Sequence, residues 1–128
     1  MKKAIFLILA LCFITTLAVA ADMPVPTTDT ITIKGTVIDN ICATANVNNI
    51  SEFVKTHTKQ CALMPNCAAS GYSILSEGKL TKFDKESNVK VEEFLQKPAS
   101  ILDVVVVAKK NGEELTLVSI DNQKEEKK

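Results

Sequence analysis

Four side chains near the middle of the sequence are of types that bind metals, form disulfides or act as nucleophiles. They are three cysteines and the only histidine of the chain, namely Cys42, His57, Cys61 and Cys67. Thiolate and imidazole suit zinc, and soft thiolates also suit copper(I). A zinc or copper site is the alternative interpretation of this set, because the Cys61–Cys67 spacing departs from the Cys-x2-4-Cys knuckle of common zinc modules.

A disulfide is the interpretation that we favour for these cysteines. A bridge from Cys42 to Cys61 or Cys67 would close a loop of roughly 15–25 residues, which stabilises a fold by about 3 kcal/mol in the chain-entropy model. All three pairings stay open, and the third cysteine is left free or buried. His57 would then complete an apolar helix face with a hydrogen bond, and the protein needs no cofactor.

A third hypothesis makes Cys61 a nucleophile and His57 its base. The two residues are four apart, so they share a face if one helix runs through both. No feature marks an oxyanion hole, and the Cys-x-x-Cys motif of thiol oxidoreductases is absent from the sequence. We therefore expect that the protein is not an enzyme.

The first 20 residues have the parts of a secretory signal peptide. Lys2 and Lys3 precede an apolar run, and Ala18-Val19-Ala20 predicts cleavage after Ala20, with Ala21 as a close second. An uncleaved anchor and lipidation at Cys12 are the less favoured alternatives. We expect a periplasmic or secreted protein, in a compartment that permits disulfides.

Charge argues against two classes of partner. The chain has 15 basic and 15 acidic residues and no arginine, and cleavage removes two lysines, which leaves 13 against 15. Nucleic-acid binders usually carry a basic excess and rely on arginine. We expect no nucleic acid and, after cleavage, no membrane surface as a partner. The expected partner is a small ligand or a protein that the sequence does not identify.

Alternating and β-branched residues predict five strands in one domain, residues 31–121. A flexible leader (21–30) precedes this domain, and a charged tail (122–128) follows it. The predicted strands span 31–38, 72–75, 80–83, 102–108 (expected to be well buried) and 115–120, with a helix over 88–96. Asn111-Gly112 is a strong signal for a two-residue hairpin turn.

The cysteines lie in an insertion, residues 40–70, between the first two predicted strands. Asn49 and Glu52 resemble a capping box that would begin a helix there. Pro65 and Asn66 predict a turn before Cys67. The apolar face of that helix would contain residues at helical spacing, Ile50, Phe53, Val54 and His57.

The order of these elements predicts a mainly β fold. Five strands, with one helix between the third and fourth, are typical of an OB-like barrel, here with the Cys/His-bearing helical insertion between strands one and two. Gly35 in the middle of the first strand predicts a sharp bend, as at a barrel corner. An open α+β sheet is the alternative architecture.

Three short segments resemble a group of small exported bacterial proteins of largely unassigned function. They are Gly-x-Val-x-Asp-x-x-Cys (35–42), His-x3-Cys (57–61) and Cys-x2-Ser-Gly-Tyr (67–72). The resemblance covers residues 31–121. It implies export, an OB-like barrel, and that Cys42, His57, Cys61 and Cys67 form one unit, without saying whether that unit is a metal site or a structural clasp.

Overall fold

Five β-strands account for most of the regular structure in residues 29–125, the part of the chain that the computed structural model describes. The strands are β1 (Thr30–Asp39), β2 (Tyr72–Ser76), β3 (Lys79–Phe83), β4 (Asp103–Asn111) and β5 (Glu114–Asn122). The prediction of a mainly β chain with five strands is therefore confirmed. The predicted signal peptide, the leader up to residue 28 and the last three residues of the tail lie outside the described residues.

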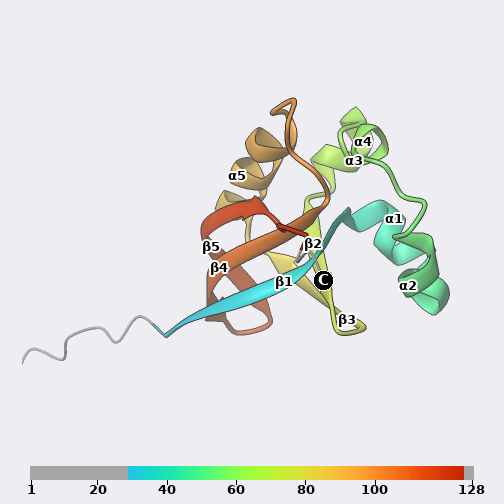
Figure 1. The fold of residues 1–128 in the computed structure, drawn as a ribbon. Coiled ribbons are helices and arrows are strands. Elements are labelled where there is room, and N and C mark those ends of the chain that lie inside the picture. Colours follow the sequence, from blue (N-terminus) through green and yellow to red (C-terminus); the bar gives the residue numbers. More distant parts are fainter. Residues whose placement is uncertain (1–28, 126–128) are drawn as a thin grey trace, which may run out of the picture.

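The strands form one mixed sheet that closes into a ring in the order β1-β2-β3-β5-β4 (Figure 1). Most neighbouring strands are antiparallel, whereas β3 and β5 are parallel and pair at two positions, Lys82 with Glu114 and Phe83 with Leu115. This parallel pair closes the ring, so the alternative of an open sheet is wrong.

Gly35 lies where β1 passes from one partner strand to the other. The first part of β1 pairs with β4 as far as Thr36, and the residues from Thr36 onward pair with β2. A Cβ atom on Gly35 would lie 2.3 Å from the carbonyl oxygen of Leu75. Only glycine permits so close an approach of two backbones at this position.

The hydrophobic core fills the closed sheet and extends to α5 (Lys85–Leu95), which contributes Val91, Phe94 and Leu95. This helix begins three residues earlier than predicted, because Asp84 caps its first turn. In β4 only one face is fully buried. Val104, Val106 and Ala108 are buried and Val105 and Val107 are half-buried, so the strand that was expected to be well buried is fully buried on one of its two faces.

The insertion folds as short helices outside the ring, on the right in Figure 1. They are α1 (Asn40–Ala45), the 3-10 helix η1 (Val47–Asn49), α2 (Ile50–Phe53), α3 (Lys59–Ala62) and α4 (Pro65–Ala69). None of these is long, and an isolated helix of this length is unstable in water. Their positions are therefore set by packing and caps.

Three expectations for the insertion are wrong. The helix that begins at Ile50 ends at Phe53, so His57 lies between α2 and α3 and shares no helix face with Cys61. Asn49 makes no side-chain cap hydrogen bond, so the capping box does not form. Pro65 is the first residue of α4 instead of part of a turn, which suits a proline because that position needs no N–H donor.

Within residues 29–125, no helix has the length and apolar character needed to cross a membrane.

Candidate metal centre

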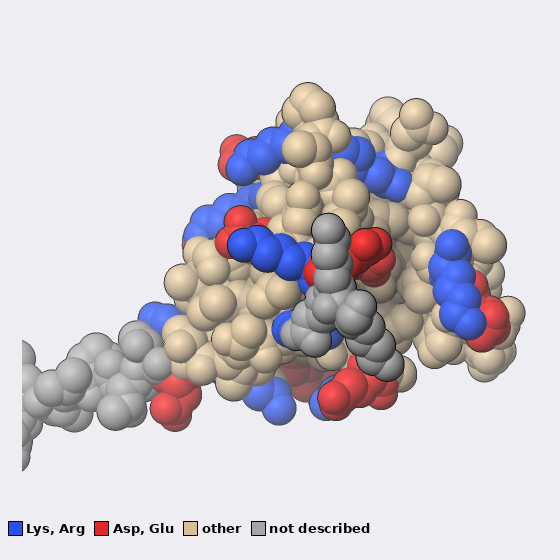
Figure 2. All heavy atoms as spheres, viewed as in Figure 1, with Lys and Arg blue, Asp and Glu red and all other residues tan. Residues whose placement is uncertain are grey.

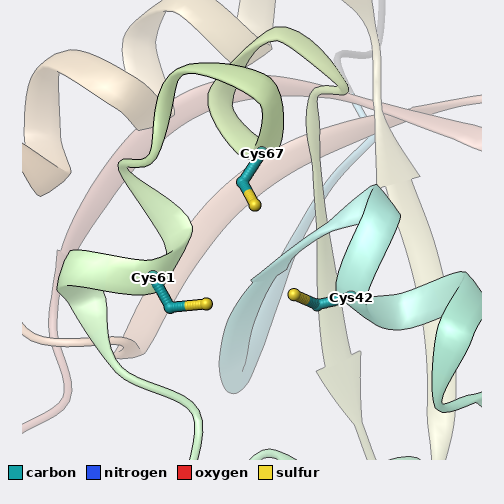
Figure 3. Close-up of side chains that lie close together, drawn as sticks. All are labelled: Cys42, Cys61 and Cys67. Carbon is teal, nitrogen blue, oxygen red and sulfur yellow. The ribbon is translucent and has the colours of Figure 1, made fainter.

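Three helices of the insertion bring the predicted cysteines together. Cys42 comes from α1, Cys61 from α3 and Cys67 from α4, and all three Sγ atoms lie within 4.8 Å of one another. Figure 3 shows the three side chains pointing toward one common space. Cys67 is buried, the other two are half-buried, and all three are free thiols in this structure. We call these three residues the thiol cluster.

Caps hold two of the cysteines in place. The Oδ1 atom of Asp39 accepts a hydrogen bond of 2.9 Å from the backbone N–H of Cys42, as the N-cap of α1. The hydroxyl of Thr58 accepts one of 3.2 Å from the N–H of Cys61, as the N-cap of α3. Both cysteines therefore lie in the first turn of a capped helix, where the cap sets the direction of the chain.

Ser70 connects the third cysteine to the first. Its hydroxyl donates to the carbonyl oxygen of Cys67 at 2.6 Å and accepts from the N–H of Ile41 at 3.2 Å. The backbone of α4 is thereby joined to that of α1, although the two helices are far apart in the sequence. This connection holds Cys67 opposite Cys42.

Helix α3 is anchored to the closed sheet and to the segment after α5. The hydroxyl of Tyr72, on β2, donates to the carbonyl oxygen of Ala62 at 3.0 Å. The ammonium group of Lys59 donates to the carbonyl oxygens of Lys97 at 3.0 Å and Ser100 at 2.8 Å. Cys61 lies between these two anchors in the sequence, so its position depends on both.

His57 lies beside the cluster as the partner of Asp39. The Nε2 atom of His57 and the Oδ2 atom of Asp39 are 3.0 Å apart, and both side chains are almost fully buried. Donor atoms of Asp39, Cys42 and His57 form a second group within 4.8 Å, which shares only Cys42 with the thiol cluster. The buried Nδ1 atom of His57 has no hydrogen-bond partner among the described residues.

Asp39 is the site residue that the sequence reasoning missed. It stood in the quoted Gly-x-Val-x-Asp-x-x-Cys segment without a role. Its buried carboxylate caps Cys42 with one oxygen and contacts His57 with the other. The available signal was an aspartate at the end of a strand, three residues before a cysteine, which is the spacing of an N-cap to its N3 residue.

The surroundings of the thiols disfavour their charged form. Burial, followed by the hydrogen bond and negative charge of Asp39, raises the pKa of Cys42 to about 12. Burial and the charge of Asp39 also raise the pKa of Cys67. These two residues are therefore neutral thiols at neutral pH, which makes them poor nucleophiles, and a metal that binds them must displace their protons.

Three convergent sulfur atoms fit the donor chemistry of a soft metal ion. Tetrahedral zinc with bonds of about 2.3 Å would hold its sulfur ligands roughly 3.8 Å apart. The present separations of up to 4.8 Å would contract only modestly to reach that arrangement. Comparisons of the chain with protein-family models, curated proteins and solved structures gave no match.

Proposed function

We propose that this is an exported, non-enzymatic protein that binds one thiophilic ion through Cys42, Cys61 and Cys67. The convergence of three free thiols from three separate helices is the observation that carries the proposal. Soft thiolate ligands select thiophilic ions over hard cations such as magnesium or calcium.

The number of sulfur atoms favours an ion over the predicted disulfide. A disulfide uses two sulfur atoms and gives no reason for a third to lie within 4.8 Å of both. An ion uses all three. The disulfide clasp stays a competing prediction, and a thiol count distinguishes it from ion binding.

The geometry also changes the proposed ligand set. The alternative from the sequence included His57 as a fourth ligand, but the donor group that contains His57 shares only Cys42 with the thiol cluster, and its Nε2 atom is engaged by Asp39. We propose instead that His57 is a positioning residue, which orients Asp39 and through it Cys42. Partners of metal ligands typically affect metal affinity by 10–100-fold.

The remaining parts of the proposal concern fold class, partners and export. The ring order, with one parallel pair, supports an OB-like barrel that carries the insertion as a binding element. On the face shown in Figure 2, basic and acidic side chains are interspersed, which supports a partner other than nucleic acid. The sequence of residues 1–20 supports export.

A thiol count on protein isolated from the producing cells is the first test. The full chain with Cys12→Ser is denatured with chelator, alkylated without reductant and weighed intact, so that every modified thiol belongs to the cluster. Three modified thiols support an ion site. One modified thiol establishes a disulfide and overturns the proposal.

Cadmium titration of the reduced protein is the second test, because cadmium thiolates absorb in the ultraviolet. We expect saturation at one ion per chain. Each of Cys42→Ser, Cys61→Ser and Cys67→Ser should weaken binding strongly. Ser87→Cys, which adds a cysteine in α5 outside the thiol cluster, is the control, and it should not raise the number of cadmium ions bound per chain. Binding that is unchanged in all three serine variants would contradict the assignment.

A further inference from the structure

The charge around the thiol cluster bears on which ion it suits. The buried carboxylate of Asp39 has an oxygen within 4.8 Å of the Cys42 sulfur, and His57 is its basic partner. Lys59, two residues before Cys61, directs its ammonium group to the carbonyl oxygens of residues 97, 98 and 100. The structure thus places an acidic group against the sulfur atoms, while this nearby lysine is engaged elsewhere.

An ion held by three thiolates at this place leaves a net charge that depends on its valence. A monovalent ion leaves two negative charges, a divalent ion leaves one, and a trivalent ion leaves none. Uncompensated charge is costly to bury, and a neighbouring carboxylate adds repulsion to that cost. Neutral complexes therefore suit the cluster best.

The number of donors leads to the same class of ion. The thiol cluster contains three sulfur atoms, and His57 belongs to a different donor group. Structural zinc sites are almost always completed by four protein ligands. Trivalent arsenic and antimony form three bonds, and a lone pair occupies the remaining position, so three thiols complete their valence.

We propose that the thiol cluster binds a trivalent thiophilic metalloid, with arsenite as the ligand, through the sulfur atoms of Cys42, Cys61 and Cys67. The proposal rests on the ion-binding function above and specifies its ligand class. Arsenous acid, As(OH)3, exchanges its three hydroxyl groups for three thiols. Three As–S bonds form, three As–O bonds break, and each thiol proton leaves on a hydroxyl as water. Arsenic stays trivalent, so the step needs no oxidant or reductant.

Arsenite titration of the reduced full chain with Cys12→Ser tests this directly under anaerobic conditions. We expect one adduct whose intact mass equals the protein plus one arsenic minus three hydrogens, with loss of all three reactive thiols. Loss of a residue that only contacts a metal ligand weakens binding by up to about 100-fold, and loss of the ligand itself should weaken it more. Each Cys→Ser variant should therefore bind arsenite at least about 100-fold more weakly. An adduct that retains a free thiol would contradict three-sulfur binding.

Competition between arsenite and cadmium separates this inference from the proposed function. Binding of arsenite in preference to cadmium supports the inference. Tight one-to-one cadmium binding, with arsenite bound no more tightly than by a simple dithiol, overturns the inference and leaves the proposed function intact. Failure of both ions to bind the reduced, folded protein overturns both.

Asp39→Asn tests the charge argument without removing a sulfur atom. Asparagine keeps the N-cap, and the change removes the negative charge next to Cys42. Cadmium affinity should rise relative to arsenite affinity by about tenfold or more, because only the cadmium complex carries a net charge. Asp84→Asn, at the other strand-to-helix corner, is the matched control. An equal change for both ions in Asp39→Asn would contradict the charge argument.

Discussion

Two corners of the molecule share one local design. At the end of β1, Asp39 caps α1 and accepts a hydrogen bond of 2.9 Å from the N–H of Cys42. At the end of β3, Asp84 caps α5 and accepts one of 2.9 Å from the N–H of Ser87. In both corners an aspartate at the end of a strand or directly after it caps a helix and fixes the residue three positions later.

The two corners differ in what the second carboxylate oxygen and the third residue contact. Asp39 is fully buried and pairs with His57, while Cys42 joins the thiol cluster. Asp84 is half-buried and accepts from the hydroxyl of Thr116, while the hydroxyl of Ser87 accepts from the N–H of Leu117. The same cap therefore serves a candidate site in one corner and joins a helix to the sheet in the other.

Asp39→Ala should produce the largest loss of stability. The substitution removes a cap and leaves the buried Nε2 of His57 without its hydrogen-bond partner, so the free energy of unfolding should fall by about 2–4 kcal/mol. Denaturant unfolding of the reduced protein measures this. A loss no greater than that of Asp84→Ala would mean that the two corners are energetically equivalent.

Cys42 should react far more slowly than an unfolded cysteine. Raising its pKa from 9.0 to about 12 lowers the thiolate fraction at pH 8 by roughly three orders of magnitude. Alkylation with iodoacetamide followed by peptide mapping, on folded and on denatured protein, gives the ratio. Comparable rates in the two states would show that the corner does not suppress the thiolate.

Asp84→Ala should lower the free energy of unfolding by less than Asp39→Ala does. It removes a helix N-cap but leaves no buried imidazole without its partner, so we expect a loss of about 1–2 kcal/mol. Asp84→Asn keeps the capping geometry and serves as the control, with most of the stability retained. Equal losses in both variants would indicate that charge, not the cap, is responsible.

The smallest expected effect is the pH dependence of the stability that the charge of Asp84 contributes to its corner. Burial would raise the pKa of Asp84, but hydrogen bonds from Ser87 and Thr116 outweigh burial and lower it. The stability that its charge contributes is therefore present above the ordinary aspartate pKa of about 3.9 and is lost as pH falls through the folded value. The difference between wild type and Asp84→Asn should shrink steadily as the pH falls below about 3.9, as followed by unfolding curves at several pH values. A difference that does not change as the pH falls would contradict this assignment.

The strands were predictable because their signals are local. Alternating apolar residues marked β1, and Glu77 and Gly78 form the β2–β3 turn with positive φ, as in a type I′ hairpin. The β4–β5 turn was displaced by one residue, since Asn111 still pairs with Glu114 and the turn consists of Gly112 and Glu113. Turn signals locate a hairpin better than they fix its register.

The insertion was predictable only in its residue types. Periodicity suggested one helix through His57, but the chain forms α2 and α3 with a break between them. Helices of four residues gain little from intrinsic propensity, because nucleation is costly. The position of α3 is set by hydrogen bonds of Thr58, Tyr72 and Lys59. Tyr72 bonds to a residue 10 positions away along the chain, and Lys59 to one 41 positions away.

The sequence by itself determined that the chain forms five strands, because side-chain alternation and turn residues act over a few positions. It also determined that three thiols and one imidazole are available between two of those strands. Only the tertiary structure decided which of these meet. Pairing of β1 with β2 sets Asp39 opposite Tyr72 in a buried position, and contacts across the insertion then group the three sulfur atoms and pair His57 with Asp39. Such groupings depend on hydrogen bonds between distant residues, which no local pattern encodes.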